Sequence, residues 1–125
     1  MDDRSSKITL GGEEYELLFT TRAAKEISKR FGGLDKLGDA LQSLPTDEQL
    51  ELTVWLIVVL ANQAIMIRNL KNRENKKELL TVEYVELISF PDELAGCTDA
   101  VFEAVNKGMN RSVKSEDDSK NAEVG

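Results

Sequence analysis

Residues 52–67 have the sequence LTVWLIVVLANQAIMI, which contains no Asp, Glu, Lys or Arg. The rest of the chain is well supplied with charge: 31% of the 125 residues are charged, and the net charge is −7. A stretch this apolar can be a membrane span, a core helix, or a helix that contacts another protein. The choice among these three decides how the rest of the chain is interpreted.

The apolar stretch lies inside a predicted helix that runs from Thr46 to about Leu70. Pro45 ends the segment before it, and Thr46 with Gln49 three residues later matches a capping box, which satisfies free N–H groups at a helix start. No helix breaker follows within this range. After Leu70 the chain becomes polar through KNRENKKE, which indicates the end of the helix and a loop.

A membrane span is the interpretation that the sequence favours least. Crossing a bilayer takes about 20 predominantly apolar residues, and fewer than that lie between Glu51 and Arg68. Asn62 and Gln63 fall inside the stretch, where polar groups are costly in lipid, and no second candidate span exists to receive them. The helix is therefore predicted to pack against protein.

Placed on a helical wheel at about 100° per residue, the helix is apolar around most of its circumference. A narrow polar stripe contains Glu51, Asn62 and Asn69. One apolar face consists of Leu50, Val54, Ile57, Ala61 and Ile65. A second face, on a different side, consists of Leu52, Trp55, Val59, Met66 and Leu70. A helix of this kind must be covered on more than one side.

Two interpretations of the second face stay open. Neighbouring elements of the same chain can wrap the helix completely, or one face can be left for another protein chain. Aromatic and Met side chains are enriched at the centres of such interfaces. The candidate partner-binding residues are therefore Leu52, Trp55, Val59 and Met66, with self-association as one possible use.

The flanking sequence predicts a β-hairpin and several shorter helices. In residues 7–19, KITLGGEEYELLF, polar and apolar residues alternate around Gly11-Gly12, which suits a two-residue turn. Helices are predicted for RAAKEISKRF, with a Thr20 or Thr21 cap and a Gly32-Gly33 stop, for LDKLGDALQSL, after Thr81, and from Pro91 onward. The predicted fold class is mainly α with a small N-terminal β-hairpin (α+β), a compact helical domain around one long central apolar helix.

This domain is predicted to cover residues 7–109, after a flexible N-terminus at 1–6. The inward residues of the last two helices are predicted from their spacing: Val82, Val85 and Ile88, then Leu94, Val101, Val105 and Met109, with Phe102 beside them. Residues 110–125, NRSVKSEDDSKNAEVG, have no apolar periodicity and few bulky side chains. Such a segment buries too little surface to offset its chain entropy, so a disordered acidic tail is predicted.

The sequence offers little for catalysis, and we expect a protein that is not an enzyme. It contains no His, and its one cysteine, Cys97, has no His to activate it. We expect no catalytic residues, no cofactor and no metal site. A lone cysteine excludes an intrachain disulfide, and the N-terminus MDDRSSK has no apolar signal region, so we expect a cytoplasmic protein.

Charge narrows the class of partner. A net charge of −7 argues against broad neutralisation of nucleic-acid phosphates, and no membrane association is expected. The one basic cluster contains Arg68, Lys71, Arg73, Lys76 and Lys77. We interpret it as a solvated helix end. Contact with an acidic partner or with nucleic acid is the alternative, but no aromatic residues interleave with the cluster to stack on bases.

The order of these elements resembles the tail assembly chaperones of long-tailed bacteriophages and of prophages in Gram-positive bacteria. The most similar segment is ITLGGEEYELLFTTRAAKEISKRFGGLDKL, a strand-turn-strand followed by a helix that ends in Phe-Gly. The resemblance extends over roughly residues 7–109 and concerns structural motifs. It supplies no catalytic residues.

The resemblance implies a protein of the host cytoplasm that is absent from the mature virion. Such chaperones bind the long tape measure protein, keep it soluble and help to recruit tail tube subunits. Many have a short form and a longer form made by ribosomal frameshifting, and this chain would match the short form. The alternative function is a small acidic helical regulator or adaptor that binds a basic surface of another protein.

Overall fold

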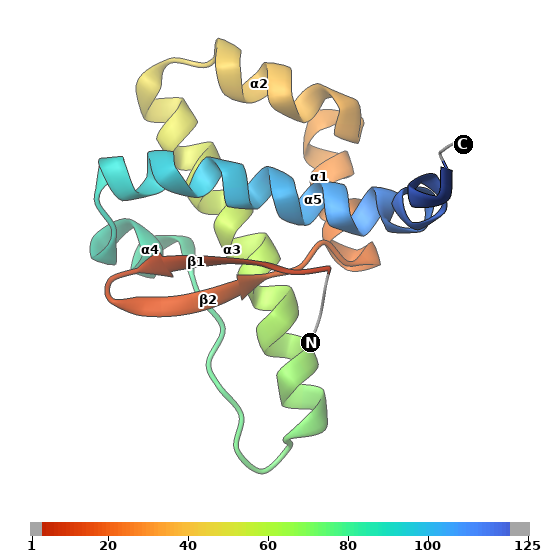
Figure 1. Cartoon of the computed structure of the whole chain (residues 1–125). Coiled ribbons are helices and arrows are strands. Elements are labelled where there is room, and N and C mark those ends of the chain that lie inside the picture. The colour runs from red at the N-terminus through yellow and green to blue at the C-terminus, as the bar shows by residue number, and fades with distance from the viewer. Residues whose placement is uncertain (1–3, 121–125) are drawn as a thin grey trace.

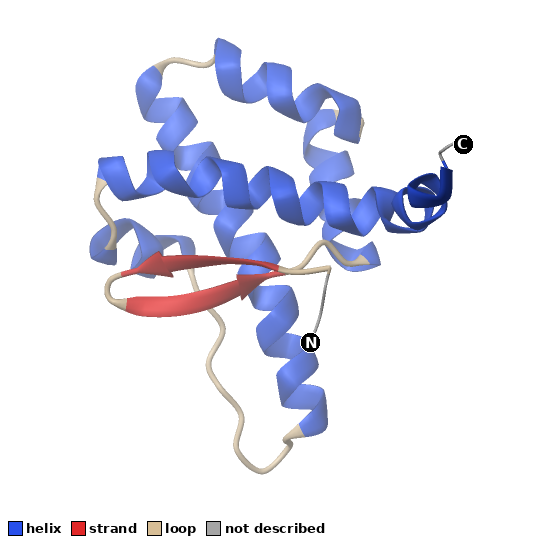
Figure 2. Ribbon diagram, viewed as in Figure 1, coloured by secondary structure: helices blue, strands red, loops and turns tan. Residues whose placement is uncertain are grey.

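The computed structural model describes residues 4–120, and for 110–120 it describes the backbone only. In chain order the elements are β1 (Ser6–Leu10), β2 (Glu13–Leu17), α1 (Thr21–Phe31), the short 3-10 helix η1 (Leu34–Lys36), α2 (Leu37–Ser43), α3 (Thr46–Lys71), α4 (Val82–Ile88) and α5 (Pro91–Lys120). Helices dominate this part of the chain, and its two strands form one antiparallel hairpin (Figure 2). The predicted fold class, mainly α with an N-terminal β-hairpin, is confirmed.

The hairpin turns at Gly11-Gly12, as the sequence predicts. Both glycines have positive φ angles, 58° and 80°, and this conformation is costly for residues with a Cβ. The two-residue turn sets the register, in which Ile8 pairs with Tyr15 and Ser6 with Leu17. Side chains of one face then point into the protein, and Ile8, Leu10 and Leu17 are buried there.

Helix α3 is the centre of the molecule (Figure 1). Helix α5 crosses it, the hairpin lies with β1 toward α5 and β2 toward α3, and α1, α2 and α4 also contact α3. Burial along α3 is nearly continuous in its middle turns and involves most of its circumference: Leu52, Thr53, Val54, Leu56, Ile57, Val59, Leu60, Ala61 and Gln63 are buried. The chain's own elements therefore cover the middle turns of this helix.

A polar contact joins α1 to α3 at a buried position. Thr20 caps α1, since its hydroxyl oxygen accepts a hydrogen bond from the Ala23 N–H at 3.2 Å. The same hydroxyl donates to Oε1 of Gln63, whose Nε2 donates to the Val59 carbonyl at 3.0 Å. Gln63 is only 5% exposed, so these bonds satisfy an amide that would otherwise be costly to bury.

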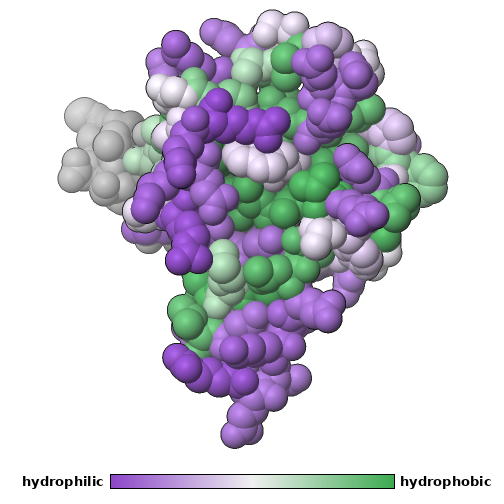
Figure 3. Space-filling model, turned by 180° about the vertical axis from the view of Figure 1, so that it is seen from behind, coloured by the Kyte–Doolittle hydropathy of each residue, from purple (hydrophilic) through white to green (hydrophobic). Residues whose placement is uncertain are grey.

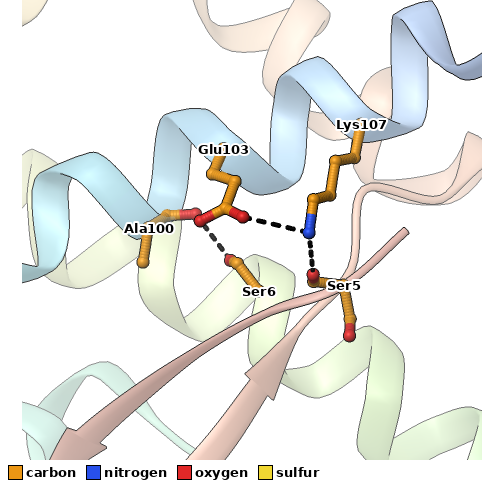
Figure 4. Close-up of polar contacts among 5 residues, drawn as sticks. All are labelled: Ser5, Ser6, Ala100, Glu103 and Lys107. Atoms are coloured by element: carbon orange, nitrogen blue, oxygen red, sulfur yellow. Dashed lines mark hydrogen bonds and ion pairs between the residues drawn. The ribbon is translucent and has the colours of Figure 1, made fainter. Parts of the chain in front are cut away.

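The start of β1 is tied to α5 by two polar contacts (Figure 4). The Ser6 hydroxyl donates to the Ala100 carbonyl at 2.6 Å, and Lys107 Nζ donates to the Ser5 carbonyl at 2.8 Å while pairing with Glu103 at 3.0 Å. The predicted flexible segment at 1–6 is therefore too long, because Ser6 is the first residue of β1 and is buried. Residues 1–3 lie outside the described part of the chain.

Several local predictions require correction. The capping box at Thr46 is wrong: Pro45 occupies the N-cap position without a side-chain bond, and the amide of Gln49 donates to the Leu44 carbonyl at 2.9 Å instead. Val82 and Met109 are 37% and 50% exposed rather than inward. Val82 is the first residue of the short α4, and Met109 lies one turn after Val105, the last buried residue described on α5, so neither is enclosed by neighbours.

Helix α5 also continues beyond the predicted end of the domain. The sequence places that end at Met109, whereas the helical backbone extends to Lys120. The predicted disordered tail at 110–125 therefore overlaps helical backbone in 110–120, and residues 121–125 lie outside the described part of the chain.

Candidate partner-binding surface

The four residues proposed from the sequence as a partner-binding face do not form one open face. Leu52 and Val59 are 1% and 6% exposed and belong to the core. Trp55 and Met66 are half-buried. The prediction that all four present an unoccupied face is therefore wrong for Leu52 and Val59, because neighbouring elements cover that side of α3. Whether Trp55 and Met66 contact a partner stays a prediction.

Trp55 has partners within the chain. Its ring makes an edge-to-face contact with Phe31, with ring centroids 6.4 Å apart and an angle of 71° between the planes. The Arg30 guanidinium lies 4.5 Å from the centroid of the indole ring, within the range of a cation–π interaction. The end of α1 thus covers the part of α3 that carries Trp55.

By length and composition, Thr46–Lys71 could cross a membrane. Half of its most apolar 18-residue window is nevertheless buried inside the fold. A core helix of a water-soluble domain meets the same criteria. The contacts described above therefore cover half of this window and leave the other half at least partly exposed.

The apolar surface that α3 leaves open lies at its C-terminal end. Exposure rises after Gln63, and Ile67 and Leu70 are 36% and 67% exposed. Leu79, from the loop that follows α3, is 47% exposed. Ile67, Leu70 and Leu79 line one groove, which has a volume of about 650 Å³. Seen from behind, a hydrophobic area ends just above the hydrophilic lower tip of the molecule (Figure 3), where the last turns of α3 and this loop lie. We call this hollow the α3 groove.

The charge around the α3 groove is opposite to that of the whole chain. Its lining includes Arg22, Arg73 and Lys76, and no Asp or Glu is among the described lining residues. Arg22 also contacts the groove residue Met66, with 3.6 Å between Nη1 and Sδ. An apolar floor with a basic rim favours an apolar segment that carries acidic residues. The groove is thus a surface at which residues of the basic cluster can contact an acidic partner, the alternative interpretation of that cluster.

The loop beside the groove is held by two asparagines of the polar stripe. Asn62 and Asn69 are seven residues apart, so they project from the same side of α3. Asn62 donates to the Leu80 carbonyl at 2.9 Å and accepts from the Leu80 N–H at 2.8 Å. Asn69 makes the same pair of bonds with Lys77, both at 2.9 Å. The polar stripe that the sequence showed is thus an attachment site for residues 77–80.

Replacing Asn62 by alanine is expected to release the Leu80 end of this loop and to leave Asn69 as its one remaining attachment at residues 77–80. The N–H and the carbonyl of Leu80 would both lose the Asn62 side chain as their hydrogen-bond partner, at a local cost of about 1–3 kcal/mol. Trypsin should then cleave the loop, which carries Arg73, Lys76 and Lys77, about ten times faster, since cleavage follows the population of the open form. Mass spectrometry of the fragments measures this rate. The exposed Asn106 of α5 offers a control, and equal loop cleavage in the Asn62→Ala and Asn106→Ala variants would contradict the attachment role.

The shifted pKa values of Tyr15 and Cys97 are explained by their surroundings. Burial, followed by the hydrogen bond to Glu13, raises the pKa of Tyr15 to about 12, so its hydroxyl remains protonated at neutral pH and donates to Glu13 at 3.0 Å. Burial, with a smaller effect from Glu93, raises the pKa of the Cys97 thiol. Thiols of this kind react slowly because the thiolate is scarce. Among the described residues, no group of three or more His, Cys, Asp or Glu side chains is placed to hold a metal ion.

Sequence reasoning missed Ile67, Leu79 and Arg22 as parts of the exposed surface. Leu70 was placed on the second face of α3 but was not among the four proposed residues. For Ile67, Leu70 and Leu79 the available signal was their position next to a polar, basic segment, where few elements remain to cover them. For Arg22 the sequence offered no such signal.

Comparison with known proteins adds no relative. No family model, no curated protein and no solved structure matches the chain.

Proposed function

We propose that this protein is a tail assembly chaperone of a long-tailed bacteriophage or prophage, corresponding to the short form. It binds the tape measure protein, keeps it soluble and helps to recruit tail tube subunits, without catalysis and in the host cytoplasm. The resemblance of residues 7–109 is the basis of this proposal. The observation that best supports a binding function is the α3 groove, with its exposed Ile67, Leu70 and Leu79.

In this proposal, the α3 groove shields apolar surface of the tape measure protein. A long helical protein exposes apolar stripes before assembly, and shielding them requires a complementary apolar surface on a soluble partner. The groove is small, so one copy covers a short stretch of helix, and several copies along the tape measure protein would cover more. Self-association between neighbouring copies is compatible with this arrangement and belongs to the proposal.

Replacing Leu70 by glutamate is expected to abolish this shielding. The side chain is 67% exposed, so the protein should fold normally, but a carboxylate would enter the apolar floor. The measurement is the soluble fraction of the tape measure protein after co-expression, determined by ultracentrifugation. Wild type should keep it soluble, and the Leu70→Glu variant should leave most of it in the pellet.

The matched control is Leu87→Glu. Leu87 is 79% exposed and lies on α4, outside the groove, so the same chemical change should leave the shielding intact. If Leu70→Glu works as well as wild type, the groove is not the binding site. If wild-type protein does not keep the tape measure protein soluble and instead binds a polymerase, nuclease or repressor in the same cells, the regulator alternative replaces the chaperone.

A further inference from the structure

The outer edge of β2 has main-chain groups without partners. With a two-residue turn, Leu10 and Glu13 form the first hydrogen-bonded pair, and such pairs alternate with pairs that exchange no hydrogen bonds. Glu14 opposite Thr9 and Glu16 opposite Lys7 are therefore of the second kind. Their N–H and C=O groups point away from β1, and no bond to them occurs within residues 4–109.

This edge borders a second hollow, which shares the lining residue Leu79 with the α3 groove. The hollow has a volume of about 590 Å³ and lies between β2 and residues 77–81, with Ala61, Ala64 and Ile65 of α3 among its lining residues. In Figure 1 the free edge of β2 faces the loop that joins α3 to α4. Because Asn62 and Asn69 hold that loop against α3, the far wall of the hollow is fixed in place.

The side chains of β2 determine what kind of strand can be added. The inner face continues through Tyr15 and the buried Leu17, whereas Glu14 and Glu16 project from the opposite, outer face. A second copy of β2 at this edge would place glutamates beside glutamates, which is destabilising. Lysine or arginine beside these positions is favourable. The other charged residues that line the hollow are Glu13 and Glu78, which are acidic, and Arg68 and Lys77, which are basic, so Glu14 and Glu16 make its balance acidic. Charge therefore disfavours a second copy of the chain and favours a basic segment.

We propose that the edge of β2 binds an extended segment of a partner protein as a third strand. Alternate residues of that segment are apolar and lie over the half-buried Ala64 and Ile65 of α3, and the residues between them are basic and lie beside Glu14 and Glu16. Main-chain hydrogen bonds provide the attachment, and the alternation provides the specificity. This inference concerns a second site and does not depend on the chaperone function.

The first test uses a fluorescently labelled heptapeptide of alternating lysine and valine with the full-length protein. Fluorescence anisotropy should show saturable binding, whereas a peptide of alternating glutamate and valine should not bind. A lysine–valine peptide with proline in the centre keeps the charge but cannot complete the strand. Its affinity should be at least about tenfold lower, the factor that corresponds to losing about 1.4 kcal/mol of main-chain bonding. Equal binding of the two basic peptides would overturn the proposal.

The second test alters the protein at Glu14. Glu14→Pro removes the edge N–H without removing a hydrogen bond to β1, and proline is tolerated in edge strands at such positions. Glu14→Gln removes the same charge and keeps the N–H. The proline variant should bind the alternating peptide at least about tenfold more weakly, and the glutamine variant only about two- to threefold more weakly. Equal affinities for the two variants, with matching circular dichroism spectra, would contradict strand addition.

Hydrogen exchange of the wild-type protein gives a result even if the proline variant does not fold. The amides of Glu14 and Glu16 should exchange rapidly in the free protein and slowly with the lysine–valine peptide bound. Protection confined to other regions would show that the peptide binds elsewhere, and the proposal would then be rejected.

Discussion

Replacing Leu60 by alanine is expected to destabilise the protein by about 3 kcal/mol, within the range of about 2–5 kcal/mol for such changes in a core. Leu60 is fully buried in the middle of α3, and its carbonyl accepts a bond from the Leu18 N–H at 3.2 Å. The smaller side chain leaves a cavity that the surrounding helices and hairpin can fill only partly. Against a total stability of about 5–15 kcal/mol for a domain, this is a large fraction.

Urea denaturation, followed by circular dichroism and by the fluorescence of Trp55, measures this loss. The control is Leu87→Ala, which removes the same atoms from a side chain that is 79% exposed. Its effect should stay within about 0.5 kcal/mol. A loss below about 1 kcal/mol for Leu60→Ala would mean that α3 is less completely enclosed than its contacts indicate.

Replacing Gly108 by alanine is expected to destabilise the protein by about 1–3 kcal/mol, although alanine is the better helix former. A Cβ at this position of α5 would lie 2.6 Å from the carbonyl oxygen and 2.8 Å from the Cβ of Phe19. One of these atoms belongs to the backbone, so a side-chain rotation cannot relieve the clash. The chain after β2 and helix α5 would have to move apart.

Gly96 of the same helix provides the matched control. A Cβ there would meet no atom within 4 Å, so Gly96→Ala should stabilise the protein by up to about 1 kcal/mol through helix propensity alone. The two substitutions are chemically identical and are expected to have opposite signs in the same urea titration. Stabilisation by both would disprove the close contact between α5 and Phe19.

The local elements were predictable because short-range patterns determine them. Gly11-Gly12 marks the turn of the hairpin, and Thr20 and Thr81 cap α1 and α4 through hydrogen bonds from nearby N–H groups. The capping box at Thr46 was the exception. There the side chain of Gln49 bonds the Leu44 carbonyl, which lies before Pro45, and the motif gives no information about that competing acceptor.

The candidate site was less predictable for a different reason. A helical wheel shows which residues share a side of α3, but it contains no information about which element lies opposite. Leu52 and Val59 share a side with Leu70, yet the first two are buried and Leu70 is 67% exposed. The difference arises along the helix axis, because the other elements cover the middle turns and stop before the end.

By itself, the sequence determined that a long apolar helix forms, that a glycine-turned hairpin precedes it and that shorter helices surround it. These features depend on residues a few positions apart, whose spacing is visible in one dimension. Only the tertiary structure decided that α3 is covered in its middle and open near Leu70, and that Asn62 and Asn69 hold a loop. The edge of β2 was likewise left free by the arrangement of distant segments. Burial and pairing of this kind depend on contacts between residues far apart in the chain, and local periodicity cannot encode them.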